Sequence, residues 1–152
     1  EIDNFPTVKR STGGQAVLHG TSKDELTYSV VLNKTSSFKK IYQDIGNILI
    51  YFLKQFGLNA SFGYTLDNYR DDFDCFTSQT PADIVVNDTK IIGSAQYRKG
   101  TSILQHGSVR LNKIQDLSKK SVSFEDAMHI LKTSFETKFN INFINYVLPD
   151  TM

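Results

Sequence analysis

The spacing of apolar positions is most regular in one segment near the middle of the chain. Between Ser37 and Phe56, apolar residues recur every three or four positions, and Gly57 follows the last of them. This period is typical of an amphipathic helix, and a glycine directly after it is a common helix stop. The sequence therefore predicts a helix over residues 37–56 whose apolar face packs on a sheet. Its predicted apolar face consists of Phe38, Ile41, Tyr42, Ile45, Leu49, Phe52 and Phe56.

The segment before this helix has a different pattern. The run LTYSVVL, Leu26–Leu32, is rich in β-branched and aromatic residues and predicts a strand. Further upstream, Gly13 and Gly14 precede a short apolar run, which favours a tight turn leading into a strand over Ala16–Leu18.

The second half of the chain predicts a meander of three strands followed by a helix. Asn87-Asp88 and then Lys99-Gly100 supply turn residues between the runs ADIVV, KIIGSAQYR and TSILQHGSV. In SVSFEDAMHILKTSFETKF, a serine and an aspartate three positions apart match a capping box, which predicts the helix. The apolar end, INFINYVLPDTM, predicts a final strand or an extended tail. The residues expected at the cap and on the packing face of this helix are Ser123, Asp126, Phe124, Ala127, Met128, Leu131 and Phe135.

Runs of strands with two helices packed against them predict an α+β fold with a mixed, largely antiparallel sheet. The 152 residues fit one domain over 1–152. A net charge of +1 gives no reason to expect nucleic acid as a partner, and no window approaches the ~18 apolar residues of a membrane helix. A single cysteine excludes an intrachain disulfide and favours a reducing, cytoplasmic compartment.

Three features of the sequence are candidates for chemistry, and each has both a structural and a functional interpretation. Lys90 would be solvated at a hairpin turn, or its ammonium would turn inward over small residues and stabilise a developing anion. Cys75 would be an inert buried thiol, or a nucleophile activated by a cation such as Lys90. Gly13-Gly14 would form a simple turn, or let backbone N–H groups approach a ligand.

The histidines allow the same two interpretations. His19 and His106 each end an apolar run beside a glycine, and for either alone a structural role is favoured. No spacing of histidine, cysteine and carboxylate residues matches a metal site, so none is predicted.

Taken together, RSTGGQAVLHG and CF…ADIVVNDTKIIGSAQYRKGTSILQHGSV resemble the biotin/lipoate A/B protein ligase superfamily. The spacing is closest to that of the cysteine-dependent octanoyltransferases that are similar in sequence to lipoate–protein ligase A. The resemblance covers Val8 to Leu111 and implies that the early helix and strand of the family's catalytic domain are missing from this stretch. It implies Cys75 and Lys90 as catalytic residues. The substrate-binding residues that it implies are Arg10, Gly13, Gly14, His19, Gly93, Ser94, Ala95, His106 and Gly107.

The resemblance implies transfer of octanoyl from acyl carrier protein to a lysine of a lipoyl domain through a thioester on Cys75. The acceptor would be the glycine cleavage H protein or an E2 subunit, and no cofactor would be needed. A second hypothesis is lipoate–protein ligation, in which ATP and Mg²⁺ take part and the cysteine is incidental. A third is a non-catalytic module that holds an acyl chain or a lipoyl domain for a partner chain.

Overall fold

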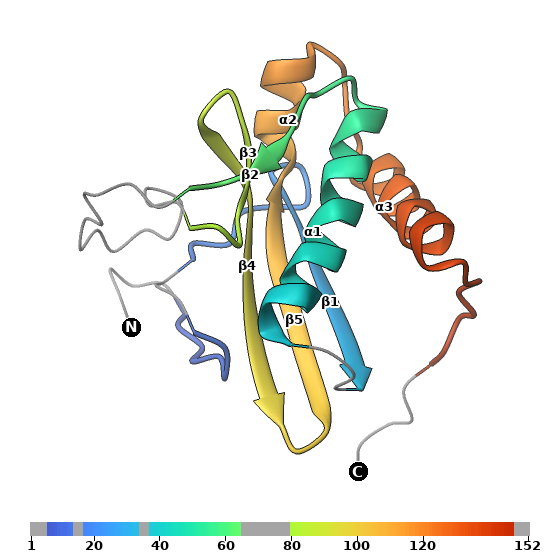
Figure 1. Ribbon diagram of the computed structural model, residues 1–152. Coiled ribbons are helices and arrows are strands. Elements are labelled where there is room, and N and C mark those ends of the chain that lie inside the picture. The colour runs from blue at the N-terminus through green and yellow to red at the C-terminus, as the bar shows by residue number, and fades with distance from the viewer. Residues whose placement is uncertain (1–5, 14–16, 34–36, 65–79, 148–152) are drawn as a thin grey trace.

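One antiparallel sheet forms the framework of the molecule (Figure 1). The computed structural model describes residues 6–13, 17–33, 37–64 and 80–147. Within them the strand order is β1–β5–β4–β3–β2, and every recorded strand pair is antiparallel. This arrangement confirms the predicted α+β class and the meander β3–β4–β5. The strands are β1 (Glu25–Asn33), β2 (Ser61–Phe62), β3 (Ile84–Val86), β4 (Thr89–Lys99) and β5 (Ser102–Arg110).

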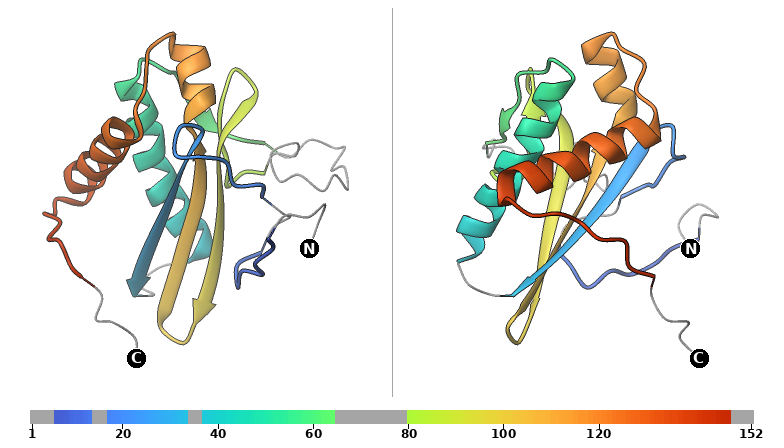
Figure 2. Two further views of the ribbon diagram at one scale, coloured as in Figure 1. Left: turned by 180° about the vertical axis from the view of Figure 1, so that it is seen from behind. Right: turned by 90° about the vertical axis from the view of Figure 1, so that its right-hand side faces the viewer.

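Helices α1 (Phe38–Gln55) and α3 (Phe124–Phe139) lie on one side of the sheet, and the segment 6–13 lies on the other side (Figure 2). The predicted central helix is confirmed. The side chain of Ser37 accepts a hydrogen bond from the backbone N–H of Lys40, which caps α1, and Gly57 follows the helix with a φ of +80°. The apolar face of α1 is fully buried at Ile45, Phe52 and Leu53 and forms the centre of the core.

The two hairpin turns differ in how well the sequence predicts them. Asn87 and Asp88 both have positive φ, 47° and 61°, as a two-residue turn with the twist of a hairpin requires, so the first turn is confirmed. The second prediction was wrong by one residue. Lys99 pairs with Ser102, so the turn consists of Gly100 and Thr101, with Gly100 taking the positive φ of 57°.

The C-terminal helix is confirmed together with its cap, because the backbone N–H of Asp126 donates to Oγ of Ser123 at 3.0 Å. Met128 lies on the same side of the helix as Leu131 and Phe135, because all three line one groove, but it is 52% exposed. The sequence prediction also missed the eight-residue helix α2 (Leu111–Ser118), whose buried residues Leu111 and Ile114 are too few to produce a clear period. Residues 141–147 are exposed and contain no strand, so they form the extended tail.

The strand predicted over Ala16–Leu18 was wrong for the two residues that the structure describes. Val17 and Leu18 belong to no strand, and Leu18 is 73% exposed. Ala16 lies outside the described residues. This segment instead runs as a loop toward β1, where Nδ1 of His19 lies 2.6 Å from Oε1 of Glu25. Among the described residues, no helix has the length and apolar character needed to cross a membrane.

Candidate active site

Side chains along β4 and β5 alternate between the two faces of the sheet, and this alternation separates the small residues of the Gly-Ser-Ala stretch. Ser94 and Gln96 pair with Gly107 and Gln105 on the face that α1 covers. Gly93 and Ala95 point to the opposite face, which we call the outer face. Their partners across the register are Ser108 and His106.

Lys90 is the central charged group of the outer face. Its side chain is only 3% exposed, and its Nζ lies 3.1 Å from Oδ2 of Asp83, which is 4% exposed. A Cβ added to Gly93 would lie 3.0 Å from Cε of Lys90, so the ammonium group lies directly over the bare backbone of this glycine. The ammonium group of Lys90 therefore points inward, as the second of the two interpretations expects. The sequence prediction missed Asp83, although a carboxylate immediately before an all-apolar strand is a signal for a buried pair.

A second cluster on the outer face joins the N-terminal segment to β5. Nε2 of His106 lies 2.6 Å from Oγ1 of Thr12, a hydrogen bond between residues 94 positions apart. Burial lowers the pKa of His106, and the charges of Arg10 and His19 lower it further. The structure therefore brings the N-terminal segment, through Thr12, against His106 of β5. Arg10 also donates to the backbone carbonyl of Gly13 at 3.1 Å.

The outer face also contains a polar group that sequence reasoning missed. Ser108 is buried next to Gly93 in the register, and its Oγ has no hydrogen-bond partner among the described residues. A buried hydroxyl without a partner is unfavourable, because its hydrogen bonds to water are lost without replacement. This hydroxyl adds a donor to the row formed by Lys90 and His106 on the same face.

Ser94 takes part in a different set of contacts, on the face covered by α1. Its Oγ lies 2.7 Å from the phenolic oxygen of Tyr28, which also accepts a hydrogen bond from Nε2 of Gln105 at 3.2 Å. Nε2 of Gln96 donates to Oε1 of Gln105 at 2.7 Å and extends this series of hydrogen bonds. Burial raises the pKa of Tyr28 to about 12, so the phenol is neutral at physiological pH.

Gly107 leaves room for this network. A Cβ at this position would lie 2.6 Å from the ring of Tyr28 and 2.5 Å from the carbonyl oxygen of Gly93. Both distances are far shorter than a normal contact, so only glycine fits beneath the tyrosine ring. The His-Gly pair of β5 thus has one member on each face, with His106 on the outer face and Gly107 under Tyr28.

Cys75 and Gly14 lie outside the described residues, so the relation of the thiol to Lys90 stays a prediction. Within the described part of the chain, no group of three or more histidine, cysteine and carboxylate side chains is arranged to hold a metal ion.

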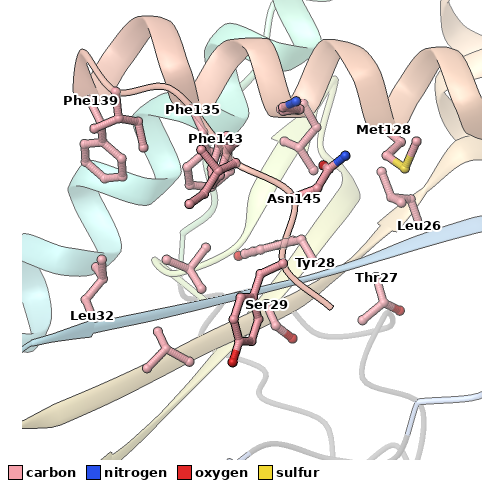
Figure 3. A pocket seen from close by; sticks show the side chains of 17 residues that line it. Leu26, Thr27, Tyr28, Ser29, Leu32, Met128, Phe135, Phe139, Phe143 and Asn145 are labelled. Atoms are coloured by element: carbon pink, nitrogen blue, oxygen red, sulfur yellow. The ribbon is translucent and has the colours of Figure 1, made fainter. Parts of the chain in front are cut away.

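A separate apolar groove of about 630 Å³ lies between β1, α3 and the tail (Figure 3). It is lined by Leu26, Tyr28 and Leu32 of β1 and by Phe135 of α3, and Phe143 of the tail lines it as well. None of the predicted site residues that the structure describes lines it. The groove is therefore distinct from the outer-face cluster around Lys90.

This fold is shared with solved lipoate protein ligases. A putative lipoate protein ligase from T. acidophilum with bound lipoic acid superposes with a TM-score of 0.73 at 21% identity, covering 93% of this chain and 61% of that one. A lipoate-protein ligase A bound with ATP gives a TM-score of 0.68 at 19% identity, covering 93% of this chain and 62% of the other. The sheet and its covering helices thus have the same fold as these two proteins.

The sequence comparisons place the chain more narrowly. Residues 1–138 match the model of the lipoyl protein ligase A/B catalytic domain, and the chain belongs to that family. It is 30% identical to octanoyltransferase LipM of Bacillus subtilis (strain 168) over 95% of its length, and 28% identical to that of Exiguobacterium sp. over 94%. The chain spans 66% of the length of each of these two relatives. The predicted resemblance to the octanoyltransferase branch is confirmed.

Proposed function

We propose that this chain is an octanoyltransferase domain that moves an octanoyl group from acyl carrier protein to a lysine of a lipoyl domain. The observation that carries the proposal is the buried ammonium of Lys90, held over the bare backbone of Gly93. A cation fixed in a site with little water stabilises a negative charge that develops on an acyl oxygen. The names of the curated relatives support octanoyl as the transferred group.

In the first step, the thiolate of Cys75 attacks the carbonyl carbon of the octanoyl thioester on the carrier protein. The resulting oxyanion is stabilised by Lys90 and by backbone N–H groups, an effect of about 3–4 kcal/mol per donor in other enzymes. The bond between the carbonyl carbon and the carrier sulfur then breaks. The carrier leaves as a thiolate that takes up a proton, and octanoyl remains on Cys75 as a thioester.

In the second step, the neutral amine of the acceptor lysine attacks the same carbonyl carbon. The intermediate loses a proton, the bond to the cysteine sulfur breaks, and the products are an octanoyl amide and the free Cys75 thiol. A thioester is converted to a more stable amide, so the transfer needs no nucleotide. Arg10, Gly13, Gly14 and His19 would bind the substrates.

The strand residues would complete the substrate site. Ala95 would border the acyl chain near Lys90, and His106 pairs with Ala95 in the register of β4 and β5. Ser94 and Gly107 would act indirectly, because their contacts on the other face fix the path of β4 and β5.

The proposal is tested by intact-mass measurement after the purified chain is mixed with octanoyl-acyl carrier protein. Wild type should gain the mass of one octanoyl group, and Cys75→Ala should gain none. Adding a lipoyl domain should then move the mass to that domain. If wild type gains no octanoyl under conditions where it is folded, the covalent step is wrong.

The same preparation discriminates between the other two hypotheses. A ligase would attach free lipoate in the presence of ATP and Mg²⁺ and would do so equally well as Cys75→Ser. A non-catalytic module would bind the lipoyl domain without modifying it in either assay.

A further inference from the structure

Asp83, the buried partner of Lys90, is itself held in place by hydrogen bonds from Thr80. Oδ2 of Asp83 accepts hydrogen bonds from the backbone N–H of Thr80 at 2.7 Å and from its Oγ1 at 3.0 Å. The same oxygen lies 3.1 Å from Nζ of Lys90. One carboxylate oxygen thus connects the turn before β3 to the ammonium group of Lys90 on β4.

A lysine ammonium needs such a connection in order to act at one place. The side chain has four flexible carbon–carbon bonds, and it loses much rotamer freedom when its end is fixed. Lys90 lies where the register between β3 and β4 shifts at Ile84/Val85, so its direction differs from the regular alternation of the strand. Asp83 fixes the end of the side chain over Gly93, whose missing Cβ leaves the required space.

We propose that Asp83 is a positioning residue, which together with Thr80 holds the Lys90 ammonium at the point where the acyl oxyanion forms. The inference rests on the proposed function, because it assigns Asp83 a task only if Lys90 takes part in acyl transfer. Asp83 touches no substrate in this account and acts through Lys90 alone.

The charge of Asp83 and its positioning of Lys90 should affect the rate in opposite directions, which makes the proposal testable. A carboxylate beside the ammonium cancels part of its attraction for an oxyanion. If charge alone decided the rate, removing the charge of Asp83 would make transfer faster. If position decides, the ammonium moves away from the reacting oxygen and transfer becomes slower, because a displacement of about 1 Å can cost on the order of 10²-fold in rate.

The experiment is a double-mutant cycle on octanoyl transfer with Asp83→Asn, Lys90→Gln and the double variant. Asp116→Asn, an exposed carboxylate on α2, is the matched control. We expect Asp83→Asn to lower kcat by about 10²-fold with KM changed less than about threefold. In the Lys90→Gln background the same substitution should change kcat by less than about threefold. Thr80→Val, which removes one of the two hydrogen bonds to the carboxylate, should give a smaller loss of kcat of the same kind.

The possible outcomes test the positioning role of Asp83 and the proposed function of Lys90 separately. Wild-type or faster transfer by Asp83→Asn, or an equal loss in both backgrounds, would overturn the positioning role. If Lys90→Gln itself transfers at the wild-type rate, the proposed function of Lys90 is wrong. If Asp83→Asn does not fold at the assay temperature, Thr80→Val decides, and an unchanged kcat in that variant would then exclude the role.

Discussion

The hydroxyl of Tyr28 on β1 lies 2.7 Å from Oγ of Ser94 on β4, and the two groups meet across the intervening strand β5. The tyrosine ring reaches Ser94 by passing over Gly107, where no side chain blocks it. This side-chain contact on the face covered by α1 thus joins β1 to β4, two strands that each pair with β5 through their backbones. The opposite face of the same strands carries the candidate catalytic groups.

Gly107→Ala should destabilise the fold, because the added methyl group collides with the ring of Tyr28 and with the carbonyl of Gly93. We expect a loss of about 1–3 kcal/mol in the free energy of unfolding, measured by urea denaturation. Gly13→Ala is the control, since a Cβ there would meet no atom of the described residues within 4 Å. Equal stability of the two variants would contradict the proposed crowding at Gly107.

Tyr28→Phe should weaken the same region by removing the shared oxygen while keeping the ring. Oγ of Ser94 and Nε2 of Gln105 both lose a hydrogen-bond partner in a buried setting. The expected cost is about 1–3 kcal/mol in the free energy of unfolding. Tyr97→Phe, at a more exposed position on β4, should change stability by less than about 0.5 kcal/mol. An unaltered urea midpoint for Tyr28→Phe would argue against the network.

His106 should make the fold less stable in mild acid. Its pKa is lowered in the folded state by burial, by Arg10 and by His19, so the unfolded chain binds a proton more readily. The free energy of unfolding should therefore fall as the pH drops below the ordinary histidine pKa of about 6.5 and continue to fall until the folded form is protonated.

Urea denaturation at pH 7.5 and at pH 5.5 measures this effect. We expect His106→Gln to lose less stability between the two pH values than wild type. His129→Gln, at an exposed position of α3, is the matched control and should behave like wild type. A pH dependence of His106→Gln equal to that of wild type would rule out this role of the imidazole.

Lys90→Met should destabilise the protein apart from any effect on activity, because it leaves the carboxylate of Asp83 buried without its ammonium partner. Breaking a buried pair in this way costs about 3–5 kcal/mol in other proteins. Lys113→Met removes a more exposed pair with Asp116 and should cost at most about 1 kcal/mol. Thermal unfolding of both variants measures the difference. Adding Asp83→Asn to Lys90→Met should restore part of the loss, and a further loss instead would contradict the unpaired-charge explanation.

The parts of the fold that the sequence predicts are those with a strong local signal. The period of α1, the Ser123 cap and the Asn87-Asp88 turn each depend on neighbouring residues, and all three are confirmed. The weaker signals failed. Helix α2 is too short to show a period, and the apolar residues Val17 and Leu18 find no strand to pair with.

The candidate site could be predicted as a set of residues but not as an arrangement. The resemblance selected Lys90 and His106, whereas the pairing of Asp83 with Lys90 and the place of Ser108 beside Gly93 follow only when the register of β3, β4 and β5 is known. Side chains separated along the chain meet through strand pairing, which composition and spacing do not specify. The division of Gly93 and Ser94 between the two faces follows from alternation once β4 is recognised as one continuous strand.

The hydrogen bond between Thr12 and His106 also has a consequence for the order in which the molecule folds. The β4–β5 hairpin closes over few residues and is expected to form early, whereas β1 must find β5 over a long intervening chain. The hydrogen bond between Thr12 and His106 joins residues 94 positions apart, so we expect it to form late as well. A refolding chain should therefore regain its helical signal before the proposed octanoyl transfer.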